Sequence, residues 1–361
     1  MMLNLSSKGA RLVTPSAVCR IVLAVIAFTS LGFAVDARLL SMLPAKSEAV
    51  AGIDVQAILN SGIVQELMKS SPTGASSLAE FAAMTGVDVK RDIHSVLFAG
   101  YTRPNAQGAT KPGGAIGVGF ITGTFDPTRI GGAILSKGGK KQPYKGYTLY
   151  TPEASTNKDG DVLTFLDAGT IVAGDPAQVK QVLDKAQGGL PTAILSRVNE
   201  VSNRYDIWGV SAVPPAAMAG SLSSSPAGGD AGPGAMAGDF FKKVESTQGG
   251  IKLGPTINIG LEVISTSPED ATALMNVLGF FRSMVGSQPA KEGQPGPPAG
   301  LTKMLNAIQM RTEAKTLFLT MDVPEADVVG FLREAQKKAA ESKAAGSEPK
   351  AKTPEEITVV Q

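Results

Sequence analysis

The sequence is poor in the residues that most often build metal sites, disulfides and catalytic triads. It contains one cysteine, Cys19, and one histidine, His94, among 361 residues. A single cysteine excludes an intrachain disulfide, and these counts exclude zinc and haem sites of the ordinary ligand sets. A histidine-based triad would depend on His94 alone, and no Gly-x-Ser-x-Gly elbow accompanies it. We therefore expect a structural His94, no catalytic residue, no metal and no cofactor.

Aromatic residues and net charge are also scarce. Aromatics make up 5% of the chain and hydrophobic residues 43%, so the core must consist mainly of aliphatic side chains. The net charge of +2 arises near the N-terminus, where Lys8, Arg11 and Arg20 face only Asp36. A neutral remainder has no field to attract phosphates, which predicts no nucleic-acid partner. The lysines at 137–141 lie among glycines and predict a solvated hairpin.

The N-terminus has the three parts of a secretory signal. Basic residues precede an uncharged run, Ile21–Ala34, and small residues then allow a cut after Ala34 or after Ala37. The run is short for a span, which needs about 20 residues. We therefore expect residues 1–37 to be a signal peptide and the protein to be periplasmic or secreted. The alternative is an uncleaved anchor at residues 21–35, which would hold the protein at the inner membrane and be its one membrane contact.

Hydrophobic periodicity predicts alternating strands and helices. Apolar strand patterns occur at 49–55, 93–101, 115–125, 144–151 and 161–173, the last two read as one hairpin pair. Asp-Pro pairs at 126–127 and 175–176 have the N-cap and first-position residues of helices. These patterns predict an α+β fold with mainly antiparallel strands and helices packed on one face.

The order of strand and helix patterns in the second half of the chain repeats that of the first half, which predicts an internal duplication. Each repeat would be a strand–helix–strand–strand–helix–hairpin–helix unit. Three matches occur in the same order: Ile207–Ser211 with Val50–Asp54, Ile259–Pro268 with Gly117–Pro127, and Asp322-Val-Pro324 with Asp175-Pro176.

Domain boundaries follow from this repeat and from composition. We expect a first α+β repeat at residues 38–190 and a second at 191–337. Two Gly/Ser/Ala/Pro tracts, 216–238 and 286–300, lack the apolar content to offset ordering entropy and predict disordered insertions. Residues 338–361 predict a disordered tail.

Several motifs resemble known sites but lack the context that their chemistry needs. The glycines of 117–123 are spaced G-x-G-x-x-x-G inside a strand pattern, which excludes a dinucleotide loop. Ser155-Thr-Asn-Lys158 matches Ser-x-x-Lys without its companion elements. The overlapping turn resembles a calcium loop, but its twelfth position is Leu166 rather than glutamate.

The carboxylates also suggest no acidic pair. We interpret Asp126, Asp175 and Asp322 as residues that begin helices, and Glu262 as a residue that points outward from a strand. Glycoside hydrolysis would need two facing carboxylates, and the sequence offers none above an ordinary solvated surface.

Three segments carry a family resemblance: Leu43–Val55, Tyr147–Pro152 and Leu166–Pro176. They resemble a group of uncharacterised exported bacterial proteins with an LP-x-x-x-x-x-V-A-x-I/V-D start and a strand ending in G-D-P before a helix. The resemblance covers most of residues 40–190. It implies export and an α+β fold, and it carries over no functional residue.

Three functions remain after these exclusions. The leading hypothesis is an exported, non-enzymatic envelope or secreted protein that binds a protein, polymer or lipid partner. A carrier of apolar ligands, with an aliphatic and methionine-lined cavity of several hundred Å³, is the alternative. A carboxylate-only hydrolase, with facing carboxylates about 5–9.5 Å apart, is the third.

Overall fold

The computed structural model describes residues 35–70, 72–102, 115–153, 160–184, 189–212, 243–286 and 299–346. Most of the expected signal peptide, the whole tract 216–238 and nearly all of the tract 286–300 lie outside the described residues. The Ser155–Lys158 motif, with the first five positions of the calcium-like turn, also lies outside them. Within the described part of the chain, no helix is long and apolar enough to cross a membrane.

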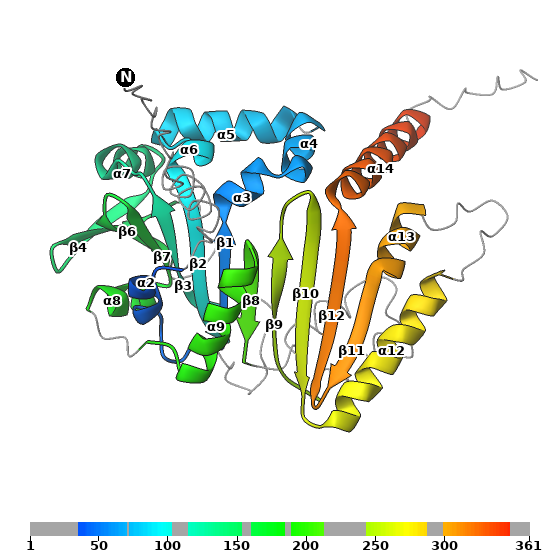
Figure 1. Ribbon diagram of the computed structural model, residues 1–361. Helices are drawn as coiled ribbons and strands as arrows, with labels where there is room; N and C mark the ends of the chain where they lie inside the picture. Colours follow the sequence, from blue (N-terminus) through cyan, green and yellow to red (C-terminus); the bar gives the residue numbers. More distant parts are fainter. Residues whose placement is uncertain are drawn as a thin grey trace, which may run out of the picture.

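The described strands form one 12-stranded sheet in the order β11-β12-β10-β9-β8-β1-β2-β3-β7-β6-β5-β4 (Figure 1). Every pairing in it is antiparallel. The predicted α+β class with an antiparallel sheet is therefore confirmed. The strands are β1 (Ala49–Asp54), β2 (Ile93–Thr102), β3 (Ala115–Gly123), β4 (Lys140–Tyr144), β5 (Tyr147–Thr151), β6 (Val162–Asp167), β7 (Thr170–Gly174), β8 (Ile207–Ser211), β9 (Val244–Lys252), β10 (Thr256–Ser265), β11 (Ile308–Glu313) and β12 (Thr316–Pro324).

The sheet has the same strand order on both sides of its centre. β1 pairs with β8, and Figure 1 shows these two strands side by side in the middle of the sheet. From β1 the order runs β2-β3-β7-β6, and from β8 it runs β9-β10-β12-β11. β3 therefore corresponds to β10 and β7 to β12, as a duplication of one unit would produce. The β4–β5 hairpin extends the first half only.

The described helices are α2 (Ala37–Ser41), α3 (Val55–Asn60), α4 (Gly62–Ser70), α5 (Pro72–Thr85), α6 (Val89–Asp92), α7 (Pro127–Ser136), α8 (Pro176–Leu183), α9 (Thr192–Arg204), α12 (Pro268–Gly286), α13 (Ala299–Ala307) and α14 (Glu325–Gly346). They lie on both faces of the sheet, which corrects the expectation of one covered face.

Strand β7 shows the reason for this two-sided covering. Successive strand residues point to opposite faces. Val172 belongs to a core cluster with α2, α8 and α9, and its neighbour Ile171 belongs to another cluster with α7. We call these the α9 face and the α7 face. The strand register places Val263 of β10 on the α7 face, where it packs with α12.

The two predicted Asp-Pro helix starts are confirmed. Asp126 accepts backbone N–H bonds from Thr128 and Arg129 at 3.0 and 3.1 Å, and Asp175 caps α8 in the same way. Each carboxylate satisfies N–H groups that the first helical turn leaves unpaired.

The third predicted helix start, Asp322, is wrong. Asp322 lies inside β12 and accepts a 2.7 Å hydrogen bond from the Asn258 side chain on β10. The ladder with β10 continues to Pro324, so the strand extends two residues beyond Asp322. α14 begins only at Glu325.

Four further segments differ from the sequence prediction. The expected strand 161–173 is two strands, β6 and β7, because Asp167 accepts a 2.8 Å hydrogen bond from the Gly169 N–H and closes a turn. The expected disordered tail from residue 338 begins as helix, since α14 continues to Gly346 through residues of high helix propensity. α9 and β9 were not predicted.

Candidate functional site

A large apolar groove lies on the α7 face of the first half, between the sheet and helices α5 and α7. Its volume is about 610 Å³. Among the described residues that line it, the polar side chains are Thr85, Lys137 and Glu153, and the latter two carry opposite charges. The apolar lining consists of Phe81, Met84, Val87, Ile93, Ile121, Phe125, Ile130, Ala133, Ile134, Pro152, Leu163, Ile171 and Ala173.

Strand periodicity explains the floor of this groove. Ile121 of β3 lies directly beside Ile171 of β7 in the register, and both point to the α7 face. Their neighbours Phe120 and Val172 point to the α9 face and are fully buried there. The two strands are therefore apolar on both faces. α8 packs on their α9 face, and their α7 face becomes the floor of the groove.

The wall formed by α5 leaves the groove open to solvent. Phe81 and Met84 keep 39% and 38% of their surface exposed. On the opposite wall, Ile130 and Ala133 of α7 are buried against the sheet. The groove is thus an accessible apolar surface, rather than a closed core void.

A second apolar pocket occupies the corresponding place in the second half. Its volume is about 380 Å³, and it lies between α12, α13 and strands β10, β11 and β12. Because β10 and β12 correspond to β3 and β7, both depressions form at equivalent positions on the α7 face.

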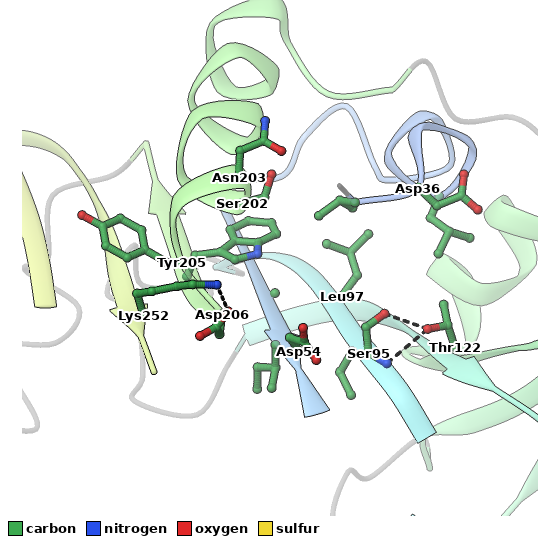
Figure 2. Close-up of a pocket in the computed structure, with 16 residues that line it drawn as sticks. Asp36, Asp54, Ser95, Leu97, Thr122, Ser202, Asn203, Tyr205, Asp206 and Lys252 are labelled. Atoms are coloured by element: carbon green, nitrogen blue, oxygen red, sulfur yellow. Dashed lines mark hydrogen bonds and ion pairs between the residues drawn. The ribbon is translucent and has the colours of Figure 1, made fainter. Parts of the chain in front are cut away.

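A smaller polar cleft of about 190 Å³ lies on the α9 face near the start of α2 and the end of α9 (Figure 2). Asp206 accepts hydrogen bonds from Lys252 Nζ at 2.5 Å and from the Leu253 N–H at 2.7 Å. The Ser95 and Thr122 hydroxyls bond each other at 2.7 Å, and Asp54 caps α3. These polar groups already form hydrogen bonds within the protein, so they offer few hydrogen bonds to a substrate.

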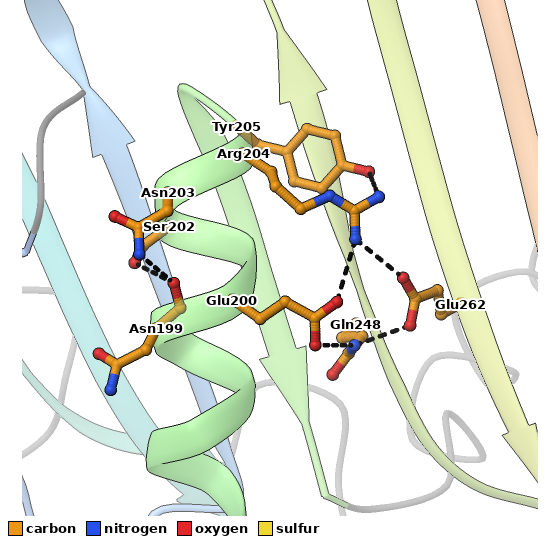
Figure 3. Close-up of polar contacts among 8 residues, drawn as sticks. All are labelled: Asn199, Glu200, Ser202, Asn203, Arg204, Tyr205, Gln248 and Glu262. Carbon is orange, nitrogen blue, oxygen red and sulfur yellow. Dashed lines mark hydrogen bonds and ion pairs between the residues drawn. The ribbon is translucent and has the colours of Figure 1, made fainter. Parts of the chain in front are cut away.

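Two carboxylates meet on the α9 face, but in an ion-paired network (Figure 3). Glu200 of α9 and Glu262 of β10 lie 3.1 and 3.2 Å from the same atom, Nη1 of Arg204. The Gln248 amide also donates to Glu262 at 2.8 Å. Partial burial alone would lower the pKa of Arg204, but Tyr205 and the two glutamates outweigh burial and raise it. The carboxylates are counter-ions to Arg204.

This network corrects the sequence interpretation of Glu262. Its side chain is only 17% exposed, so it does not simply point into solvent. No sequence pattern predicts its contact with the Arg204–Glu200 pair, because Glu200 and Glu262 lie on a helix and a strand 62 positions apart. Both carboxylates already have Arg204 as a cationic partner, so this pair does not favour the hydrolase alternative.

The other residues singled out in the sequence lie in structural positions. His94 is part of β2, and Gly117, Gly119 and Gly123 are part of β3. The Phe98 ring lies against Gly117, where any Cβ would collide with it. The lysines at 140–141 are exposed in β4, in a hairpin with β5. Among the described residues, no group of three or more His, Cys, Asp or Glu could hold a metal ion.

Comparisons with known proteins add one structural likeness. No family model and no curated protein matches the sequence. The crystal form I structure of TP0453 is similar with a TM-score of 0.43 and 8% identity, over 82% of this chain and 96% of that one.

Proposed function

We propose that this protein is an exported, non-enzymatic binding protein that holds an apolar ligand in the groove on the α7 face of its first half. The observation that carries the proposal is a depression of about 610 Å³ lined almost wholly by apolar side chains. This volume lies within the roughly 300–1,000 Å³ that is usual for ligand sites. The lining makes the carrier hypothesis the better supported of the sequence-based alternatives.

The chemistry of the groove favours a ligand without a fixed charge. Lys137 and Glu153 supply one charge of each sign, so the groove has no net preference for an anion or a cation. Burial of apolar surface supplies about 25 cal/mol per Å². A ligand that buries about 200 Å² of apolar surface would thus gain about 5 kcal/mol of binding free energy, before the cost of ordering the ligand is subtracted.

The methionine contribution is smaller than expected from composition. In the described part of the chain, Met84 is the methionine that lines the groove, and Met310 and Met321 line the second pocket. Isoleucine, leucine and phenylalanine supply most of the remaining surface. The ligand contacts are therefore mainly with aliphatic side chains of limited flexibility, which favours a groove that is largely preformed.

A groove-filling substitution tests this function. Ala173 is half-buried on the groove floor, so Ala173→Phe should project a ring into the space. We expect the affinity for the neutral fluorophore N-phenyl-1-naphthylamine to fall at least tenfold in a fluorescence titration. Ala51→Phe is the matched control, because Ala51 is exposed on the same sheet face and lines neither apolar pocket. Equal affinity in the wild type and in Ala173→Phe would refute the proposal.

Export is supported by the sequence and needs its own test. Intact mass measurement of the protein from periplasm or culture medium should give a chain that begins at Val35 or Arg38, after a cut behind Ala34 or Ala37. Recovery from the inner-membrane fraction with Met1 still present would instead support the uncleaved anchor.

A protein partner remains the second candidate function, and exposed side chains on the central strands favour it. Ile53 of β1 and Phe98 of β2 are 36% and 43% exposed on the α7 face. Large apolar side chains gathered on an open sheet face are typical of interaction surfaces. If this surface binds a protein, Phe98→Ser should abolish co-purification of the partner while leaving the affinity for N-phenyl-1-naphthylamine unchanged.

A further inference from the structure

The second apolar pocket differs from the first in its charge. Of the described residues that line it, Arg282 of α12 is the charged one. The other lining residues are Ile259, Leu261, Leu278, Leu305, Ile308, Met310, Leu319, Thr320 and Met321. The first groove carries one charge of each sign, whereas this pocket carries a single positive charge.

The guanidinium of Arg282 is held in place by a backbone carbonyl. Its Nη1 donates a 2.9 Å hydrogen bond to the carbonyl oxygen of Ile308, at the start of β11. That bond joins α12 to the sheet and orients the side chain beside the apolar wall. Within the described residues, Arg282 has no ion pair with any carboxylate, although several other arginines of the protein have one.

An arginine in this setting favours an anionic ligand group. A half-buried cation beside apolar side chains loses part of its hydration, and an anion with good hydrogen-bond geometry restores that loss. The guanidinium is planar and presents several donors, which match the two oxygens of a carboxylate. Apart from Thr320, the other lining residues that the structure describes are apolar, which suits an alkyl chain.

We propose that this second pocket is a separate binding site for a fatty acid, with the alkyl chain against β10, β11 and β12 and the carboxylate on Arg282. The volume of about 380 Å³ is near the lower end for ligand sites, which suits a single chain rather than a two-chain lipid. The inference goes beyond the proposed function, because it assigns a second site with a different ligand class.

The test compares an acid with its ester. We would titrate the protein with cis-parinaric acid and with its methyl ester, which share one fluorescent chain and differ in the carboxylate. Wild-type protein should bind the acid about tenfold more tightly, as a charge-assisted hydrogen bond supports. Arg282→Gln should remove this preference while changing the ester affinity less than twofold, and Arg282→Lys should retain part of it.

Matched variants keep the result interpretable. Arg311→Gln makes the same charge change on β11, but Arg311 is 62% exposed, pairs with Glu313 and stacks on Phe318; the acid preference should persist. Met310→Trp fills the pocket and should weaken binding of acid and ester alike. Thermal unfolding of each variant checks that loss of the Ile308 bond has not unfolded the protein.

The outcomes also separate this inference from the proposed function. Repeating the titrations in the Ala173→Phe background restricts the fatty acid to the second pocket. An Ala173→Phe protein that still binds N-phenyl-1-naphthylamine would refute the first site and leave the Arg282 comparison intact. Equal affinities for acid and ester, or the same loss in Arg282→Gln and Arg311→Gln, would overturn the fatty-acid site.

Discussion

The contact between Gly52 and Trp208 offers a sharp test of the packing at the centre of the sheet. Gly52 of β1 lies directly opposite Trp208 of β8. A Cβ at position 52 would lie 2.6 Å from Nε1 of the indole and would collide with two of its ring carbons. Trp208 is only 6% exposed and belongs to the core cluster of the α9 face. Gly52→Ala must therefore displace the ring or the strand.

The expected cost follows from two opposing effects. Overpacking a well-packed core costs about 1–3 kcal/mol, while replacing glycine within a strand recovers about 0.5–1 kcal/mol of conformational entropy. We expect Gly52→Ala to lower the free energy of unfolding by about 1–2 kcal/mol. For a chain of this size, the Tm should fall by a few degrees.

Trp208 itself supplies the assay, because it is the one tryptophan in the sequence. Chemical denaturation followed by its emission gives the stability, and the native emission maximum reports displacement of the ring. Gly209→Ala is the matched control on β8, since the nearest atom to its Cβ would be the Val50 carbonyl oxygen at 3.8 Å. A Gly52→Ala protein as stable as Gly209→Ala, with wild-type emission, would refute this reasoning.

Two further predictions concern charged groups. Lys243 and two neighbouring hydroxyls lower the pKa of Asp270 to about 2 from 3.8, so its contribution to stability is complete above pH 3.8 and is lost as pH falls through about 2. Asp270→Asn should remove this part of the acid-unfolding slope in denaturation curves measured between pH 4 and 2. Arg204→Met should destabilise the fold by about 1 kcal/mol at pH 7 in thermal unfolding, because it leaves Glu200 and Glu262 close together without their cation.

A surface pair provides the control for the Arg204 prediction. Arg311 and Glu313 form a 3.0 Å ion pair in which both side chains are mostly exposed. Exposed pairs contribute little because water and salt screen them. Glu313→Ala should change the free energy of unfolding by less than about 0.5 kcal/mol, and a loss as large as that of Arg204→Met would contradict this explanation.

Local chemistry allowed much of the first half to be predicted. The Asp126 and Asp175 caps act within a few residues of themselves, and alternating apolar residues mark β1, β2 and β3. β9 escaped prediction because its buried positions include Ser246 and Gln248 rather than apolar residues. Burial there depends on α9, which contacts β9 from across the chain. No local pattern contains that information.

The two apolar depressions show the same division between sequence and tertiary structure. Ile121 and Ile171 are each apolar strand residues in the sequence, but only the β3–β7 pairing makes them one floor. In the sequence, Arg282 is an ordinary arginine of a helix. Only the tertiary structure places it near α13 and β11, beside apolar side chains. The candidate sites were missed because each is composed of segments that are distant along the chain.

The sequence alone determined the fold class, most helix starts and strands of the first half, and the ligand sets that its residue counts exclude, because helix caps, strand alternation and residue counts act locally or need no fold at all. Tertiary structure decided which faces are covered and which charges are neutralised. Strand order and helix packing bring Glu262 to Arg204 and leave Arg282 without a carboxylate partner in the described part of the chain. Those outcomes depend on distances between remote segments, and folding alone sets them.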